Sequence, residues 1–127
     1  MARQPSPSQV DITREDVDRF SLLQPLLIAL HRDIQELAKK KQDGALTKTR
    51  TAMINRLLKD IKELLSKQPS SAYLDLLDED SVPQNADALI VAGQYLAAMS
   101  QYFSKYTKRE NYKLIWLTGQ SAEDLED

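Results

Sequence analysis

Residues 22–42 read LLQPLLIALHRDIQELAKKKQ, and this stretch decides the fold class. Five of its apolar side chains recur at spacings of four, three, four and three residues: Leu23, Leu27, Leu30, Ile34 and Leu37. At about 100° per residue these side chains form one stripe, which predicts an amphipathic helix. Around 26–30 the apolar surface nearly encircles the helix, because Ile28 points away from the stripe. A helix that is apolar all round is buried on several sides, so we expect neighbours to cover this part.

Two further helices of similar length are predicted downstream. Residues 46–67 carry an apolar face formed by Ile54, Leu57, Leu58, Ile61, Leu64 and Leu65. Residues 86–106, with Asn85 as the candidate N-cap, place on one inward face Leu89, Ala92, Leu96, Met99 and Phe103. Each helix would be about 30 Å long, and similar lengths with short connections favour antiparallel neighbours. We therefore expect an all-α fold, an antiparallel up-down bundle of three long helices with short additional helices at its ends.

Caps and helix breakers predict where the first elements begin and end. Thr13 can cap a first short helix that ends near Phe20, since acids follow it in the first turn. Pro25 predicts a break near 21–24 before the first long helix begins. Gly44 suits the turn that ends this long helix.

The connections after the second long helix are less regular. Ser70 or Ser71 can cap a short helix over 72–77, and residues 78–85 follow as a polar loop. Residues 111–117 fit either a last helical turn or a short extended segment.

Length and composition indicate a single globular domain. The chain has 127 residues, of which 42% are hydrophobic and 28% charged. We expect one helical domain over 11–118, a flexible leader over 1–10 and an acidic tail over 119–127. No unbroken apolar run exceeds the five residues of Leu26–Leu30, which is far shorter than the roughly 20 residues that span a bilayer. With no apolar signal near the N-terminus, we expect a cytoplasmic protein that does not enter the membrane.

The residue inventory argues against most enzyme chemistry. The chain has no cysteine and one histidine, His31, which excludes thiolate sites and multi-histidine metal sites. A hydrolase or ribonuclease using His31, Arg32 and Asp33 is the enzyme alternative, although adjacent helical residues do not converge. Four clustered carboxylates lack the spacing of a calcium-binding loop: Asp75, Asp78, Glu79 and Asp80. We expect no enzyme activity, no cofactor, no metal and no small-molecule substrate.

Charge is segregated along the chain. Residues 32–67 contain ten Lys or Arg and five acids, whereas residues 70–101 contain five acids and no Lys or Arg. Such a layout can serve docking between unlike faces, within the chain or between copies. Six lysines are candidates for contact with nucleic-acid phosphates: Lys39, Lys40, Lys41, Lys48, Lys59 and Lys62. No aromatic residue lies between Leu22 and Tyr73 to stack on bases, so a solvated helix surface is the competing interpretation.

Aromatic residues supply the main interface candidates. Tyr95, Tyr102 and Tyr106 are spaced seven and four residues apart, on one edge of their predicted helix. Tyrosine is favoured at interfaces, although packing at the rim of the core explains the pattern as simply. Trp116 belongs to an apolar run over 114–117, which must cover the end of the bundle or meet a partner.

These observations predict a non-enzymatic helical module for protein–protein interaction or assembly, such as an accessory subunit of a larger complex. Its partner would be another protein or a further copy of the chain, giving a homo-oligomer. Tyr95, Tyr102, Tyr106 and Trp116 would anchor the interface. The alternative is a small helical subunit that binds nucleic-acid backbone through a basic helical hairpin. No sequence motif connects the chain with a known family.

Overall fold

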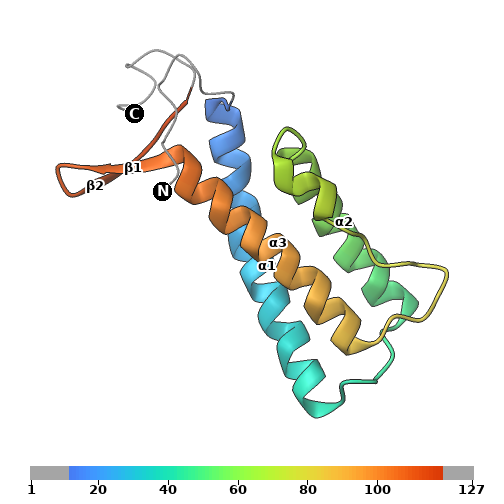
Figure 1. The fold of residues 1–127 in the computed structure, drawn as a ribbon. Coiled ribbons are helices and arrows are strands. Elements are labelled where there is room, and N and C mark those ends of the chain that lie inside the picture. The colour runs from blue at the N-terminus through green and yellow to red at the C-terminus, as the bar shows by residue number, and fades with distance from the viewer. Residues whose placement is uncertain (1–11, 119–127) are drawn as a thin grey trace.

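The computed structural model describes residues 12–118 (Figure 1). Its elements follow in the order α1 (Arg14–Lys40), α2 (Lys48–Leu64), the 3₁₀-helix η2 (Pro69–Tyr73), α3 (Asn85–Tyr106), β1 (Thr107–Glu110) and β2 (Lys113–Trp116). A mainly helical chain with three long helices is confirmed, but the chain is not all-α, because a two-stranded sheet follows α3. The predicted leader over 1–10 and acidic tail over 119–127 lie outside the described residues. Within 12–118, no helix is both long and apolar enough to cross a membrane.

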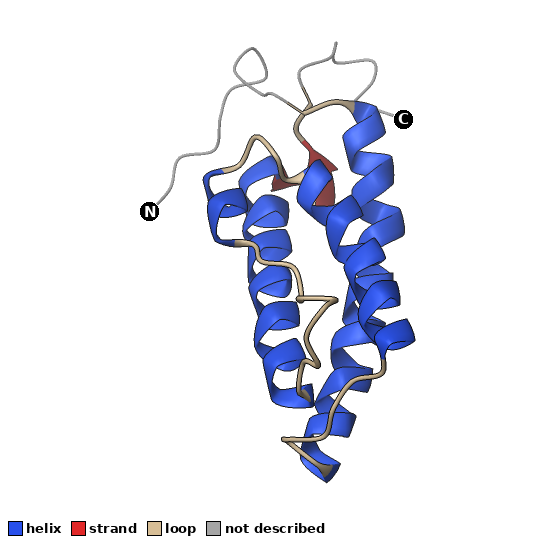
Figure 2. Cartoon of the chain, turned by 90° about the vertical axis from the view of Figure 1, so that its right-hand side faces the viewer, coloured by secondary structure: helices blue, strands red, loops and turns tan. Residues whose placement is uncertain are grey.

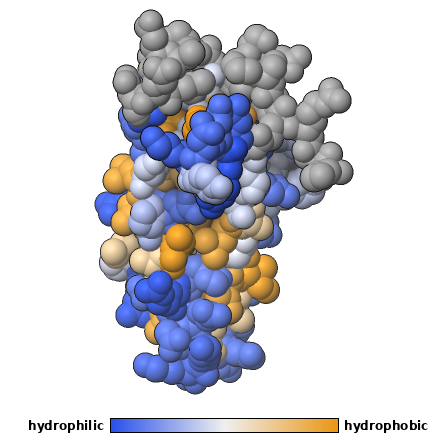
Figure 3. Space-filling view, turned by 90° about the vertical axis from the view of Figure 1, so that its left-hand side faces the viewer, coloured by the Kyte–Doolittle hydropathy of each residue, from blue (hydrophilic) through white to orange (hydrophobic). Residues whose placement is uncertain are grey.

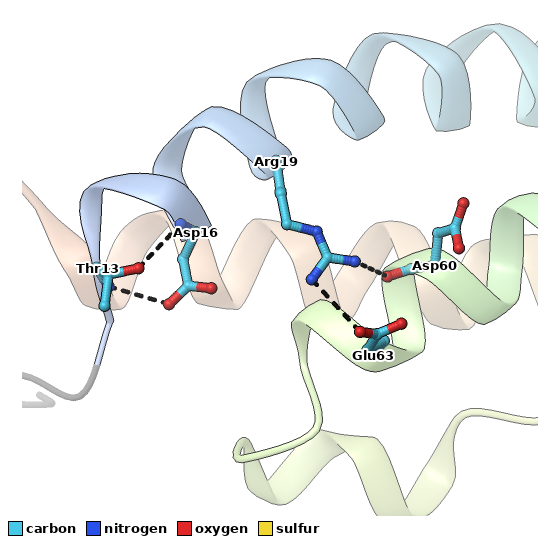
Figure 4. Close-up of polar contacts among 5 residues, drawn as sticks. All are labelled: Thr13, Asp16, Arg19, Asp60 and Glu63. Carbon is cyan, nitrogen blue, oxygen red and sulfur yellow. Dashed lines mark hydrogen bonds and ion pairs between the residues drawn. The ribbon is translucent and has the colours of Figure 1, made fainter.

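Helix α1 continues through Pro25, so the predicted break near 21–24 is wrong. Proline removes one N–H donor, and the carbonyl that loses its partner belongs to Ser21. Both residues are exposed, so water can hydrate that carbonyl. Thr13 caps the helix as predicted: its hydroxyl accepts from the Asp16 N–H at 3.2 Å, and the Asp16 carboxylate accepts from the Thr13 N–H at 3.0 Å (Figure 4). This reciprocal capping box satisfies two N–H groups at the start of the helix.

Helix α2 returns antiparallel to α1. Near the start of α1, the Arg19 guanidinium donates to the Asp60 carbonyl at 3.5 Å and lies 3.8 Å from the Glu63 carboxylate, near the end of α2 (Figure 4). An ion pair this exposed contributes less than about 1 kcal/mol. Apolar burial between the helices contributes more, from side chains that include Leu27, Ile34, Leu58 and Ile61.

Helices α2 and α3 run in the same direction, so the predicted up-down order is wrong for this pair (Figure 1). Just before the two helices start, Ala45 and Gln84 form an isolated antiparallel β-bridge. Beyond the end of α2, Gln68 Nε2 donates to the Tyr106 hydroxyl at the end of α3, at 3.0 Å. Two parallel helices need a connection as long as themselves, and residues 65–84 provide it.

Residues 74–84, which we call the return segment, lead from η2 back to the start of α3 (Figure 2). Asn55 of α2 holds this segment: its Nδ2 donates to the Leu77 carbonyl at 2.7 Å, and the Leu77 N–H donates to its Oδ1 at 2.9 Å. Tyr95 of α3 donates its hydroxyl to the Asp75 carbonyl at 2.9 Å. The return segment therefore bonds with both α2 and α3.

The sequence predicts a short helix over 72–77, and this prediction is wrong. The same contacts explain why. The helical turn of η2 ends at Tyr73, and the chain beyond it carries no regular secondary structure. Leu74 and Leu77 are buried, and the backbone of Leu77 bonds with a side chain of α2 instead of its own helix. Tertiary contacts thus override the local helical tendency.

The end of α1 and the start of α3 satisfy each other's free backbone groups. The Asn85 N–H donates to the Gly44 carbonyl at 2.8 Å, and the Asn85 side chain donates to the Lys41 carbonyl at 2.9 Å. Asn85 therefore caps the end of α1, and the predicted N-cap position of α3 belongs to Gln84. A Cβ at Gly44 would lie 2.9 Å from Asn85 Nδ2, so a larger residue there would displace the Asn85 side chain that caps α1.

Strands β1 and β2 form a hairpin that projects beyond α3 (Figure 1). Thr107 pairs with Trp116 at its base, and Glu110 pairs with Lys113 at its tip. The two loop residues, Asn111 and Tyr112, both have positive φ, at 51° and 65°. Such a loop matches the right-handed twist of the strands. Of the two predicted forms of residues 111–117, the extended one is correct.

Candidate interaction surface

An aromatic cluster joins α1, α3 and β2 at the base of the hairpin. The Phe20 ring centroid lies 5.6 Å from that of Tyr102, 5.9 Å from that of Phe103 and 5.0 Å from that of Trp116. Phe103 and Trp116 meet edge to face at 5.5 Å. Offset and edge-to-face contacts at these distances are favourable, so the cluster fixes the hairpin against the two helices.

Next to this cluster, a groove of about 580 Å³ opens on the surface. Its lining comes from α1, α3 and β2: Phe20, Ser21, Gln24, Pro25, Ile28, Ala29, Arg32, Phe103 and Trp116. Figure 3 looks from the side toward which the hairpin projects in Figure 1, and shows hydrophobic surface below a hydrophilic projection. The groove is therefore a mainly apolar hollow between two helices, with the charged hairpin beside it.

Both helices that border the groove lack charge over long stretches. Residues 21–30 of α1 and residues 88–104 of α3 contain no Asp, Glu, Lys or Arg. These stretches nevertheless reach the surface, where Leu22 is 66% exposed, Leu26 50% and Ile90 66%. The predicted burial of α1 on several sides around 26–30 is thus wrong. We call these two stretches and the groove between them the uncharged face.

Two arginines lie on the elements that border the groove. Arg32 lines it at the end nearer the C-terminus of α1. At the other end Trp116 lines the groove, and in the hairpin beyond it Arg109 pairs with Leu114, two residues along each strand from the Thr107–Trp116 pair. Since side chains two residues apart share a face of a strand, Arg109 is on the same face as Trp116.

Two acids of α1 each have a basic neighbour. Asp18 lies 3.9 Å from Arg14, and Glu36 lies 3.5 Å from Lys39. Within residues 12–118 neither Arg32 nor Arg109 forms an ion pair, the four pairs there being Arg14–Asp18, Arg19–Glu63, Lys39–Glu36 and Lys108–Glu110. Arg32 in the groove lining and Arg109 in the neighbouring hairpin therefore carry positive charge without an ion-pair partner among residues 12–118.

The predicted anchors lie deeper than an interface requires, apart from Trp116. Tyr95, Tyr102 and Tyr106 are each at most 2% exposed and belong to the core. A partner could reach them only if the core opened, so packing within the core accounts for their spacing. Trp116 is half-buried and lines the groove. The interface role of the four residues stays a prediction.

Among the described residues, Tyr95 has the most clearly shifted pKa. Burial, together with the nearby negative charge of Asp75, raises the pKa of Tyr95 to about 12 from its usual 10.0. Both causes disfavour the phenolate. The neutral hydroxyl keeps its hydrogen bond to the Asp75 carbonyl, so this residue serves the fold.

The six candidate lysines do not form one cluster. Lys39, Lys40 and Lys41 end α1, and Lys48 begins α2 at the same end of the molecule (Figure 1). Lys62 lies 14 residues beyond Lys48, which is about 21 Å along the helix. The structure therefore divides the set between the end of the bundle and the flank of α2, and nucleic-acid binding stays a prediction.

The acidic stretch forms hydrogen bonds with α2 and within itself. The Glu79 carboxylate accepts from Asn55 Nδ2 at 3.0 Å, and the Asp78 carboxylate accepts from the Asp80 N–H at 2.9 Å. In the part of the chain that the structure describes, no group of three or more His, Asp or Glu residues is placed to hold a metal ion. No ion pair within 12–118 joins the basic stretch to the acidic one.

A second hollow, of about 350 Å³, lies between α1 and α2. It has a floor of Ile34, Leu46 and Ile54 and carries both signs of charge at its rim, including Asp33 and Arg50. Arg32 faces the groove on the other side of the helix, so it does not converge with Asp33 on a common point. The cluster His31-Arg32-Asp33 is divided between surfaces, as expected for adjacent helical residues.

The sequence identifies only part of the groove lining, because most of its residues lie in stretches that are predicted to be buried. Pro25, Ile28 and Ala29 lie in the apolar stretch that predicts a buried helix, and Phe103 lies on a predicted inward face. The signal that identifies them is the lack of charge over 21–30 and 88–104, since the solvent side of a helix normally carries charged residues.

Comparisons of the chain with protein families, with curated proteins and with solved structures find no match in any of the three.

Proposed function

We propose that this protein is a non-enzymatic interaction module whose docking surface is the uncharged face formed by α1 and α3. The observation that carries the proposal is the absence of charge over residues 21–30 and 88–104, although both stretches reach the surface. Exposed apolar surface of this kind is costly in water and typical of surfaces that bind proteins.

The fold makes this surface suitable for docking. The aromatic contacts of Phe20 with Phe103 and Trp116 hold α1, α3 and the hairpin together beneath it. A preorganised surface loses little side-chain entropy on binding, which favours affinity. Trp116 keeps the anchoring role predicted from the sequence, whereas Ile28 and Pro25 take the place of the three buried tyrosines.

Site-directed photo-cross-linking in cells tests the proposal. A photoreactive phenylalanine analogue replaces Ile28 or Ala97, both on the uncharged face, or Lys59 on α2 as the matched exposed control. We expect one and the same protein, identified by mass spectrometry, to be linked from Ile28 and Ala97 and not from Lys59. That protein would be another chain or a second copy of this one. Adducts from all three positions alike, or none from the two on the face, would contradict the proposal.

A further inference from the structure

We infer that the groove beside Trp116 binds an amphipathic helix of another protein, with a carboxylate at each end of its apolar face. This inference rests on the proposed function and specifies the chemistry of the partner. It is carried by the charges at the two ends of the groove and by the length of its floor.

Charge complementarity selects an acidic partner. Arg32 lines the groove at one end, and Arg109 shares a face of the hairpin with Trp116, which lines the groove at the other end. Neither has an ion pair among residues 12–118, while Asp18 and Glu36 of α1 each have a basic neighbour. An apolar segment with carboxylates at both ends would therefore meet two available guanidinium groups, which bind carboxylates well.

The dimensions of the groove favour a helical partner. From Phe20 to Arg32 the floor follows α1 for 12 residues, or about 18 Å. A helix of similar length would place its terminal acids beside the two arginines. The α3 side offers small residues, and a Cβ built at Gly93 would meet no atom within 4 Å. A partner helix can therefore approach α3 closely.

Two synthetic peptides test this selection. Both are fluorescein-labelled helices of about 14 residues with the same leucine and alanine face, and they differ only in having glutamate or lysine at both ends. The full chain is titrated into each peptide, and binding is followed by fluorescence anisotropy. We expect the glutamate peptide to bind roughly tenfold more tightly, with a preference that decreases as salt is added.

Charge reversal separates this selection from a merely structural effect. The variant Arg32→Glu with Arg109→Glu should reverse the preference in favour of the lysine peptide. The matched control, Arg56→Glu with Lys59→Glu, makes the same change in net charge on exposed positions of α2 and should keep the original preference. Circular dichroism checks that both variants retain their helices.

Several outcomes would overturn the inference. Equal binding of the two peptides, or binding of neither, would show that the groove does not select carboxylates. If the preference for the glutamate peptide is lost in the α2 control and kept in the groove variant, the cations that select the peptide are not Arg32 and Arg109.

Experiments on the same protein also distinguish two other possible occupants of the groove. If the full chain sediments as a dimer that Ile28→Asp dissociates, the occupant is a second copy. If the glutamate peptide binds only after Glu123, Asp124, Glu126 and Asp127 are replaced by amides, the occupant is the chain's own acidic segment. A photo-cross-linked partner together with equal peptide binding would leave the proposed function standing and end this inference alone.

Discussion

Asn55 pairs with both backbone groups of Leu77, at 2.7 Å and 2.9 Å, as a neighbouring β-strand would. The amide is 2% exposed, so it bonds in a setting from which water is excluded. A buried polar group of this kind stabilises the fold only while all its partners remain bonded. Asn55 is therefore the residue on which the position of the return segment depends most directly.

Replacing Asn55 by leucine should destabilise the protein. Asn55→Leu would leave the N–H and C=O of Leu77 buried without partners, which costs about 2–3 kcal/mol. Urea unfolding measures the loss. The control Arg56→Ala, at the exposed neighbouring position, should change the free energy of unfolding by less than about 0.5 kcal/mol. An equally small change in Asn55→Leu would show that the pairing contributes little.

Tyr95 predicts a loss of stability in alkali. Its pKa is raised to about 12 in the folded chain, against 10.0 for the free side chain, so between these values the unfolded chain releases a proton that the folded chain keeps. Stability should therefore be unaffected by this group below pH 10 and fall by about 1.4 kcal/mol per pH unit above it, until the folded state also ionises near pH 12.

The variant Tyr95→Phe isolates this contribution. Urea unfolding is compared at pH 9 and pH 11, and the tyrosine protein should lose about 1 kcal/mol more than the phenylalanine variant. Identical losses in the two proteins would mean that other groups dominate the alkaline response. At neutral pH the variant should be about 1 kcal/mol less stable, because the Asp75 carbonyl loses its donor.

At the scale of elements, the hairpin is the part of the fold with the clearest strain. Tyr112 is fully exposed and has φ 65°, a conformation that costs a residue with a side chain about 1 kcal/mol or more. Asparagine tolerates such angles, so Asn111 beside it is well suited to the loop. No contact of the Tyr112 ring compensates for the strain, since the residue is 100% exposed within the described structure.

Glycine at the second loop position should stabilise the hairpin. Tyr112→Gly creates an Asn-Gly loop, which is favoured in hairpins of this type, and should gain about 1 kcal/mol. Hydrogen exchange of the hairpin amides measures the gain. Tyr112→Ala, which removes the ring and keeps the Cβ, is the matched control. A similar gain in both variants would attribute the effect to the ring and not to the backbone.

Periodicity predicts the helices well, whereas their connections depend on distant residues. The leucine spacing from Leu23 to Leu37 identifies α1. Thr13 is correctly predicted as a cap, but the sequence assigns it to a separate short helix, which in the structure is the first part of α1. Pro25 does not break the helix, because the proline and the residue whose carbonyl it frees are on the exposed side. For the hairpin the sequence allows both a helical turn and an extended segment, because four-residue strands are too short for a clear alternation.

The candidate surface was only partly predictable for a related reason. Trp116 was recognised because four consecutive apolar residues are costly to expose. The sequence places the three tyrosines at an edge of α3, and three different elements cover them. Tyr95 bonds with the return segment, Tyr106 with Gln68, and Tyr102 packs against Phe20 of α1. No local pattern in residues 74–84 predicts that they cross the bundle.

For the whole molecule, the order of the helices is the main departure from a simple bundle. The Ala45–Gln84 bridge places the starts of α2 and α3 together, and the return segment carries the chain between the two ends of the molecule. An up-down order would place Gln84 beside Lys67 at the other end of α2. The two arrangements therefore differ in which residues are neighbours, which engineered cysteines can measure in a chain that has none.

A disulfide should form between Ala45→Cys and Gln84→Cys. The link would close a loop of 84 − 45 = 39 residues and stabilise the oxidised protein by about 3–4 kcal/mol relative to the reduced one. Gel mobility and thermal melting with and without reductant measure both effects. The matched pair Lys67→Cys with Gln84→Cys should remain reduced, and preferential linkage of that pair would establish the up-down order.

The aromatic cluster has a consequence for how the protein is made. Phe20 is synthesised early, but the rings that surround it, from Tyr102, Phe103 and Trp116, leave the ribosome some 80 to 95 residues later. Until then, α1 can pair only with α2, and the leucine-rich side destined for α3 remains uncovered. A nascent chain with exposed apolar surface is vulnerable to aggregation and a natural client for chaperones. Stalled ribosomes carrying the first two helices should therefore recruit such holdases more than ribosomes carrying the full chain.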